Sequence, residues 1–142
     1  MIRREFLYLP GLALALPAIS RFAPARAQPA APKLVQIMRK DLEGQGQLVQ
    51  ETVVILADFG PGSASPWHMH PGAQELLLVT EGNLTLEVEG QGTKSINAGD
   101  GGLVPADVAH LVRNESAGVP AKGLVVFSRS AKEKPLLVLV KR

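Results

Sequence analysis

Hydrophobic and polar residues alternate in short stretches over most of the chain after residue 33. A period of two is typical of β-strands, because successive side chains point to opposite faces of a sheet. Clusters of Gly, Pro and Asn separate the stretches, and no segment of useful length shows the helical period. The pattern predicts an all-β domain, either a sandwich or a small barrel. The predicted strands are residues 34–39, 48–59, 66–70, 75–80, 84–89, 93–96, 102–104, 108–113, 122–128 and 136–140.

The stretch 84–89 shows the alternation most clearly, with apolar residues at every second position. This predicts a barrel wall with a filled interior and a wet exterior. By contrast, residues 53–56, 124–127 and 136–140 are apolar at successive positions. Both faces of these strands are therefore either covered or placed at a subunit interface.

The first 27 residues have the character of an export signal. Arg3 and Arg4 open a charged start, an apolar run follows to Ile19, and an Ala-Arg-Ala sequence ends at Ala27. This order predicts a secretory signal peptide, residues 1–27, cleaved after Ala27, and the paired arginines resemble the twin-arginine type. A membrane anchor is the alternative, but the apolar run is shorter than the ~20 residues of a spanning helix. We therefore expect export to a bacterial periplasm without a stable membrane anchor.

The remaining residues are expected to form one domain. Residues 28–33 are rich in Ala and Pro and predict a short linker, and residues 34–142 have the length of a single domain. The whole chain carries a net charge of +2, but residues 1–27 carry +3, so the rest carries −1 and nothing indicates nucleic-acid binding. The absence of cysteine excludes disulfides and thiolate chemistry. The charged run 129–134 is predicted to be a solvated loop.

All three histidines of the chain fall, with one glutamate, into two short motifs. The first motif, residues 62–82, contains His68 and His70. Being two residues apart on an extended strand, they point the same way. A Pro-Gly pair then breaks the strand, and Glu75 precedes the next apolar run. The turn can therefore bring one carboxylate beside two imidazoles.

The second motif, residues 99–114, contains the third histidine. Its last stretch alternates so that Val108, His110 and Val112 share one face. His110 is thus expected among apolar neighbours on the inner face. A buried imidazole needs a partner, and a metal ion is one good candidate.

In their spacing of glycine, paired histidines, glutamate, and later proline, histidine and asparagine, the two motifs resemble the signature motifs of the cupin superfamily. The resemblance covers residues 62–114 in detail, and the strand-rich flanks fit the same fold. It implies a small double-stranded β-helix, or jelly-roll, barrel. It also implies that His68, His70, Glu75 and His110 bind one divalent transition metal.

One position departs from the motif of that family. Asp107 stands where a glycine is usual, but Asp tolerates left-handed backbone, so the turn is expected to survive. Small cupins commonly pair by exchanging terminal strands, so the resemblance favours a homodimer over a monomer.

Three imidazoles and one carboxylate suit Mn, Fe, Ni, Zn or Cu and leave two positions of an octahedral metal open. An open position can polarise a substrate, lower the pKa of bound water or activate oxygen. The polar candidates for the pocket are few, which favours a small uncharged or aromatic ligand. They are Gln74, Thr52, Gln50 and Arg39.

We therefore expect an exported metal-dependent oxidoreductase of dioxygenase type that acts on a small organic substrate. No individual catalytic side chain beyond the metal ligands can be named. The alternatives are a noncatalytic metal or small-molecule binding module, and a metal-dependent isomerase or decarboxylase.

Overall fold

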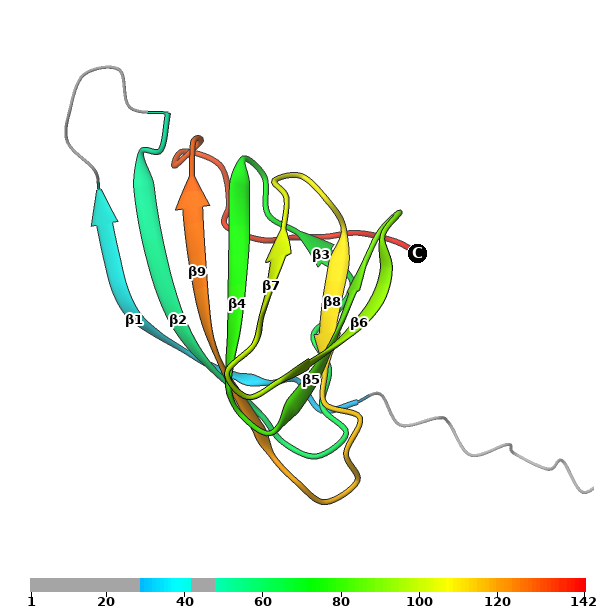
Figure 1. Ribbon diagram of the computed structural model, residues 1–142. Helices are drawn as coiled ribbons and strands as arrows, with labels where there is room; N and C mark the ends of the chain where they lie inside the picture. The colour runs from blue at the N-terminus through cyan, green and yellow to red at the C-terminus, as the bar shows by residue number, and fades with distance from the viewer. Residues whose placement is uncertain (1–28, 42–47) are drawn as a thin grey trace, which may run out of the picture.

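Two antiparallel β-sheets face each other and make up the fold (Figure 1). The computed structural model describes residues 29–41 and 48–142, so the predicted signal peptide lies outside the described residues. The described part of the chain contains no α-helix. It accordingly offers no helical segment with the length and apolar character needed to cross a bilayer.

Each sheet has five strands, and the chain passes from one sheet to the other several times. The long sheet has the order β1 (Lys33–Asp41), β2 (Glu51–Phe59), β9 (Ala121–Arg129), β4 (Ala73–Glu81) and β7 (Gly101–Val104). The short sheet has the order β10 (Val138–Leu139), β3 (His68–Met69), β8 (His110–Arg113), β5 (Asn83–Val88) and β6 (Gly92–Asn97). The predicted all-β, double-stranded β-helix barrel is confirmed.

Each strand predicted from the alternation is present, with shifted ends. The two stretches that shrink most are 66–70, of which only β3 is strand, and 136–140, of which only β10 is strand. Pro66 has no N–H to give to a ladder, and a turn begins after His70, whose carbonyl accepts from Ala73 N at 3.1 Å. Three of the residues lost from these strands, His70, Leu136 and Leu137, instead line the cavity described below.

The hydrophobic core fills the space between the sheets. Buried and exposed positions alternate along β4, which places Leu77 and Val79 inside. Close packing also requires Gly102, where a Cβ would lie 2.7 Å from Leu86 Cδ2 and 2.8 Å from Ile96 Cδ1. The fully buried apolar side chains include Val53, Leu77, Val79, Leu84, Ile96 and Val104.

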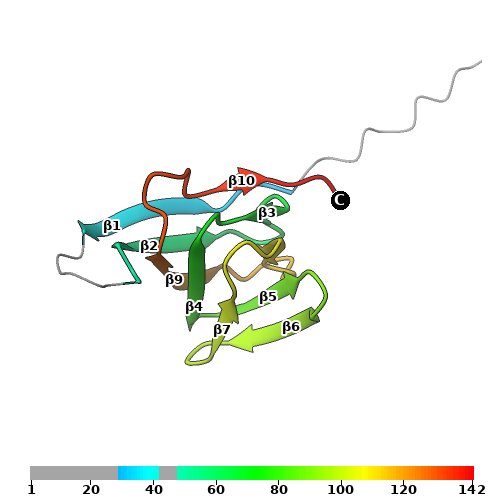
Figure 2. The same ribbon diagram turned by 90° about the horizontal axis from the view of Figure 1, so that it is seen from above.

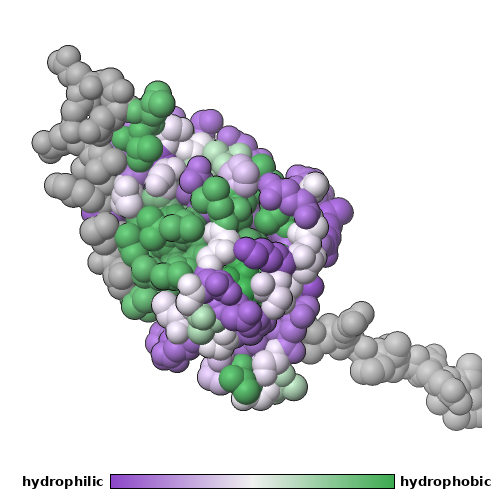
Figure 3. All heavy atoms as spheres, in the orientation of Figure 1, coloured by the Kyte–Doolittle hydropathy of each residue, from purple (hydrophilic) through white to green (hydrophobic). Residues whose placement is uncertain are grey.

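The outer face of the long sheet is apolar as well, and Figure 3 shows a hydrophobic area on the side of the molecule seen in Figure 1. Leu56 of β2 pairs with Leu124 of β9, which pairs with Leu78 of β4. The neighbouring row includes Leu76, which is 46% exposed, and Leu103, which is 51% exposed. Of the stretches that the sequence marks as apolar on both faces, those in β2 and β9 therefore have one face in the core and one that the described residues leave largely uncovered.

Candidate metal centre

The four predicted ligands come from two neighbouring strands of the short sheet, from the residue that follows one of them, and from a strand of the long sheet. His68 lies in β3 and pairs with His110 in β8, while His70 directly follows β3 and Glu75 lies in β4 of the opposite sheet. All four side chains are buried. The alternation along β3 turns Met69 away from the two histidines, as expected. The structure thus brings the residues of the first motif together with His110, which lies 35 positions after Glu75. Their binding of a metal stays a prediction.

Two turns at the site each contain a left-handed residue. In the turn after His70, Gly72 has a φ of 63°, and in the turn between β7 and β8, Asp107 has the same value, so an Asp does occupy the position where a glycine is usual. The Asp107 carboxylate accepts from Gly72 N at 3.1 Å, and Asp107 N donates to the His70 carbonyl at 3.3 Å. The Asp107 side chain therefore links the second motif to the first by a hydrogen bond that a glycine at this position could not form.

The donor atoms converge on a small volume. One candidate atom from each of the four residues lies within 4.8 Å of all the others. Glu75 Oε2 is 2.9 Å from His70 Nε2 and 3.0 Å from His110 Nε2. The His68 ring centroid lies 4.3 Å from that of His110 and 4.9 Å from that of His70. Such a set of distances matches a first coordination sphere around one ion.

Each histidine is oriented by a backbone carbonyl. His68 Nδ1 is 2.7 Å from the Pro66 carbonyl, and His110 Nδ1 is 3.0 Å from that of Val108. His70 Nδ1 is 2.6 Å from the Leu136 carbonyl. A bond at Nδ1 places the proton there and leaves Nε2 with a lone pair, which is the usual arrangement for a ligand histidine.

His70 Nε2 supplies a test of whether the donor set fits a metal. It is buried and has no hydrogen-bond partner among the described residues, although Glu75 lies beside it. A buried polar atom without a partner costs free energy. A cation at the centre would satisfy this atom, so the buried three-histidine and one-glutamate cluster fits a metal site.

The electrostatics favour the same use. Burial is the main cause that lowers the pKa of His68 from 6.5 to about 4. The hydrogen bond to the Pro66 carbonyl opposes this shift, and the neighbouring histidines add to it. Burial alone would raise the pKa of Glu75, but the imidazoles of His110 and His70 beside its carboxylate lower it to about 2. Burial opposes protonation of His110 too, but the Glu75 carboxylate outweighs it and raises the pKa. At neutral pH the centre therefore contains one carboxylate and a neutral His68, which metal binding requires.

A cavity of about 240 Å³ adjoins the centre. His68, His70 and Glu75 form one wall, and the other lining residues are apolar: Leu34, Ile55, Val112, Val125, Phe127, Leu136 and Leu137. The apolar pocket agrees with the expectation from sequence.

The proposed polar pocket groups were wrong. Gln74, Thr52, Gln50 and Arg39 do not line the cavity. Gln74 and Gln50 are exposed, and Arg39 instead bonds Glu51 at 2.9 Å. Sequence proximity to the motifs does not reveal which way these side chains point.

The predicted solvated loop 129–134 also needs correction, because Arg129 is only 1% exposed. Alternation along β9 puts Val125, Phe127 and Arg129 on the inner face. The alternation of inner and outer positions could therefore have predicted that Arg129 faces inward. The sequence prediction placed it at the surface because charged side chains are rarely buried. The role of the Leu136 carbonyl has no sequence signal, since every residue carries one.

Comparisons with known proteins agree with this geometry. Residues 55–127 match the profile of the family described as Cupin domain. Auxin-binding protein ABP19a of Prunus persica is 37% identical over 75 residues, which are 50% of this chain and 35% of that protein. Oxalate oxidase GF-3.8 of Triticum aestivum is 33% identical over 90 residues, which are 58% of this chain and 38% of that protein. The chain thus matches little more than a third of the length of these relatives.

Among solved structures, a double-stranded β-helix protein of Klebsiella pneumoniae superimposes with a TM-score of 0.62 at 17% identity, covering 82% of this chain and 90% of that chain. That similarity concerns the fold. The family match spans just over half of the 142 residues and contains all four of the clustered side chains. The chain therefore belongs to the cupin family.

Proposed function

We propose that this cupin is a metal-dependent oxidoreductase of dioxygenase type, with one divalent transition metal held by His68, His70, Glu75 and His110. The observation that carries the proposal is the buried set of three imidazoles and one carboxylate beside an apolar cavity, which His68, His70 and Glu75 of this set line. The similarity to a protein named oxalate oxidase supports an oxidative reaction.

The residues around the centre have separable tasks. Glu75 supplies the negative charge, and the carbonyls of Pro66, Val108 and Leu136 hold the three rings with Nε2 toward the centre. When bound, a metal there would supply Lewis acidity and, where it is redox active, electron exchange with dioxygen. The apolar walls exclude water and bind the substrate by its hydrocarbon surface.

The cavity favours an uncharged substrate. Apart from Glu75 and the histidines, none of the described residues that line it has a charged or polar side chain. Oxalate, the substrate in the name of the wheat relative, is a dianion that only the bound metal could neutralise, and it has no hydrocarbon surface to contact the apolar walls. We therefore propose a small neutral molecule, such as a diketone or an aromatic compound.

Oxygen consumption tests the reaction class. A dioxygenase transfers both atoms of O₂ into the product and needs no further reductant, so label from ¹⁸O₂ would appear twice in the product and no peroxide would form. The protein loaded with iron or manganese should consume oxygen with such a substrate, and His68→Ala should not. Asn114→Ala is the matched control, since Asn114 is also buried but its side chain bonds backbone groups at the end of β2 and in the neighbouring loops.

Two outcomes would favour the alternatives. Tight metal binding without turnover of any substrate would indicate a noncatalytic binding module. Turnover with zinc or nickel in the absence of oxygen would indicate an isomerase or decarboxylase.

Export and domain boundaries form part of the proposal. Residues 1–27 act as a cleaved twin-arginine-like signal, 28–33 as a linker, and 34–142 as the barrel. Support comes from the composition of the leader and from β1, which begins at Lys33. Changing Arg3 and Arg4 to Lys should block delivery to the periplasm, and unchanged delivery would indicate a general secretory route.

A homodimer through the outer face of the long sheet is proposed as well. Leu56, Leu76, Leu78 and Leu103 are all more than a third exposed there, and one monomer leaves their apolar surface in water. Light scattering should give twice the monomer mass, and Leu76→Glu should give monomers. A wild type that is monomeric at micromolar concentration would refute the dimer.

A further inference from the structure

The residues that follow β9 cross the side of the barrel where the cavity lies. This C-terminal strap, residues 130–142, is the red segment that leads into β10 in Figure 2. Leu136 and Leu137 of the strap form part of the cavity wall, together with Leu34 of β1. Beyond them β10 pairs with β3, and Val140 N donates to the Trp67 carbonyl at 3.1 Å. The strap therefore closes the cavity that contains the metal centre.

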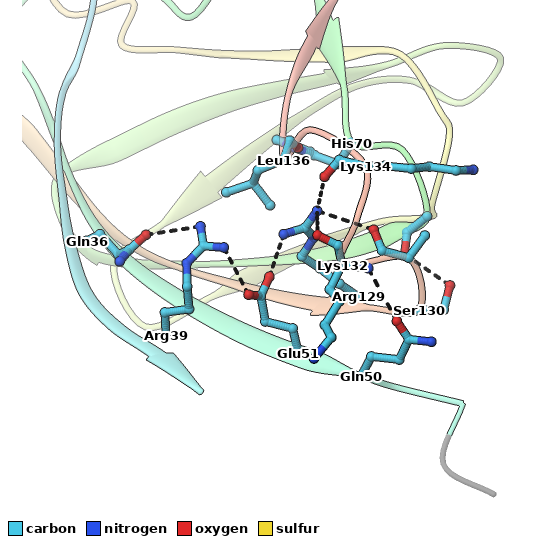
Figure 4. Close-up of polar contacts among 12 residues, drawn as sticks. Gln36, Arg39, Gln50, Glu51, His70, Arg129, Ser130, Lys132, Lys134 and Leu136 are labelled. Atoms are coloured by element: carbon cyan, nitrogen blue, oxygen red, sulfur yellow. Dashed lines mark hydrogen bonds and ion pairs between the residues drawn. The ribbon is translucent and has the colours of Figure 1, made fainter. Parts of the chain in front are cut away.

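A buried ion pair fastens the near end of the strap (Figure 4). Glu51 is 4% exposed and Arg129 is 1% exposed, and Arg129 Nη1 donates to Glu51 Oε2. The second oxygen of Glu51 accepts from Arg39 Nη1 at 2.9 Å. The other arm of Arg129, Nη2, donates to the carbonyls of Ala131, Lys132 and Lys134.

The arrangement needs a guanidinium. Its planar fork can bond a carboxylate with one arm and several carbonyls with the other, whereas a lysine ammonium is a compact point charge. Without these bonds, the carbonyls of the strap turn would lose a charged partner, and Glu51 would keep only Arg39. Removing one partner of a buried charged pair is strongly unfavourable. Arg129 thus determines the conformation of the turn that begins the strap.

The strap also touches His70 and its turn. The Leu136 carbonyl lies 2.6 Å from His70 Nδ1, and Figure 4 shows this contact beside the Arg129 cluster. Ser130 N donates to the Gly72 carbonyl at 2.9 Å. A Cβ at Gly72 would lie 2.7 Å from Ala131 Cβ, so the two segments pack backbone to side chain. The strap therefore fixes the orientation of one ligand ring.

We propose that Arg129, held by Glu51, is a positioning residue that fastens the C-terminal strap and thereby both closes the cavity and orients His70. Its effect on the strap is independent of the reaction, whereas its effect on a bound metal rests on the function proposed above. Arg129 does not line the cavity and acts only through the strap.

Hydrogen exchange of the metal-free protein tests the fastening. The reporters are the amides of Ser130, Lys134 and Val140, which are hydrogen-bonded, and the amides of the β4–β9 ladder serve as reference. In Arg129→Lys the strap amides should exchange at least about tenfold faster, since bonds to a charged group are lost. The ladder amides should change no more than in the control Ile96→Val, which loses one methyl in β6, remote from the strap.

Glu51→Gln is the second variant and decides the matter if Arg129→Lys does not fold. It keeps the shape of the side chain but removes the charge that holds the fork, so strap exchange should again rise more than ladder exchange. No rise in the strap, or an equal rise in strap and ladder, would overturn the proposal, because either result would reduce Arg129 to a general contributor to stability.

Release of cobalt measures the second effect. Co²⁺-loaded protein is mixed with excess chelator, and loss of its visible absorption is followed in time. Arg129→Lys should release Co²⁺ about tenfold faster or more, with Ile96→Val unchanged. Equal release from both variants would refute the link to His70. If the wild type binds no Co²⁺, the metal site itself is wrong, and the exchange experiment alone decides whether Arg129 fastens the strap.

Discussion

Replacing His68 with Ala should remove the metal-dependent part of the stability while leaving the barrel folded. His68 Nδ1 bonds only the Pro66 carbonyl, and the pKa near 4 shows that the ring is neutral at neutral pH. Glu75 keeps its two close partners, His70 and His110, in this variant. The change therefore takes one donor from the centre without leaving a buried charge unpaired.

The magnitude follows from mass action. A metal present at 100 times its Kd stabilises the folded state by about 2.7 kcal/mol, which is roughly 10 °C in Tm for a domain of this size. Losing a direct ligand should weaken binding by more than the ~100-fold that a lost outer partner can cost. At the same metal concentration, the gain then falls to at most about 0.4 kcal/mol, or less than ~2 °C. Loss of the Pro66 bond costs the metal-free barrel about 1 kcal/mol.

Thermal melts with and without added Mn²⁺ measure both quantities. The wild type should show the large shift, His68→Ala should show almost none, and the two metal-free proteins should melt within several degrees of each other. A His68→Ala protein that keeps the full metal shift would show that His68 is not a ligand. A variant that is unfolded without metal would show that His68 is needed for the fold.

Three further predictions concern the remaining structure. Asn114→Ala should lower the free energy of unfolding in urea by about 2–3 kcal/mol, because three carbonyls lose a buried donor, and its metal-dependent Tm shift should match that of the wild type. As the pH falls from 7 to 4, the unfolding free energy of metal-free wild type should fall relative to that of His68→Ala by up to about 3 kcal/mol, so that the variant becomes the more stable protein, because the folded-state pKa of His68 is about 4 against an ordinary 6.5 and the unfolded chain binds the proton first; a difference that does not change with pH would contradict this. Gly102→Ala should cost about 1–3 kcal/mol, since the added methyl would overlap Leu86 and Ile96, and a variant as stable as the wild type in urea would show that the core can relax.

Much of the fold could be predicted because its signal is local. The period of two assigns faces along β4 and β5 before any partner is known, and turn residues such as Gly82 and Gly90, both with positive φ, mark the strand ends. The four clustered side chains were predictable for a similar reason, since His68, His70 and Glu75 lie within eight residues. Joining His110 to them required the resemblance to a family, because its pairing with His68 spans 42 positions.

The features that escaped prediction depend on long-range packing. Arg129 was placed in a solvated loop because exposed arginines are the rule, and its burial depends on Glu51, which lies 78 positions earlier. The contact between His70 and the Leu136 carbonyl involves backbone and spans 66 positions. No side-chain pattern predicts this backbone contact, whereas the alternation along β9 does indicate that Arg129 faces inward.

Metal content tests the central claim most directly. The protein purified without added metal, and its His68→Ala and His110→Ala variants, would be measured by elemental analysis. We expect close to one equivalent of a divalent transition metal per wild-type chain and almost none in either folded variant. A wild type without metal that also takes up none on titration, or variants with full occupancy, would contradict it.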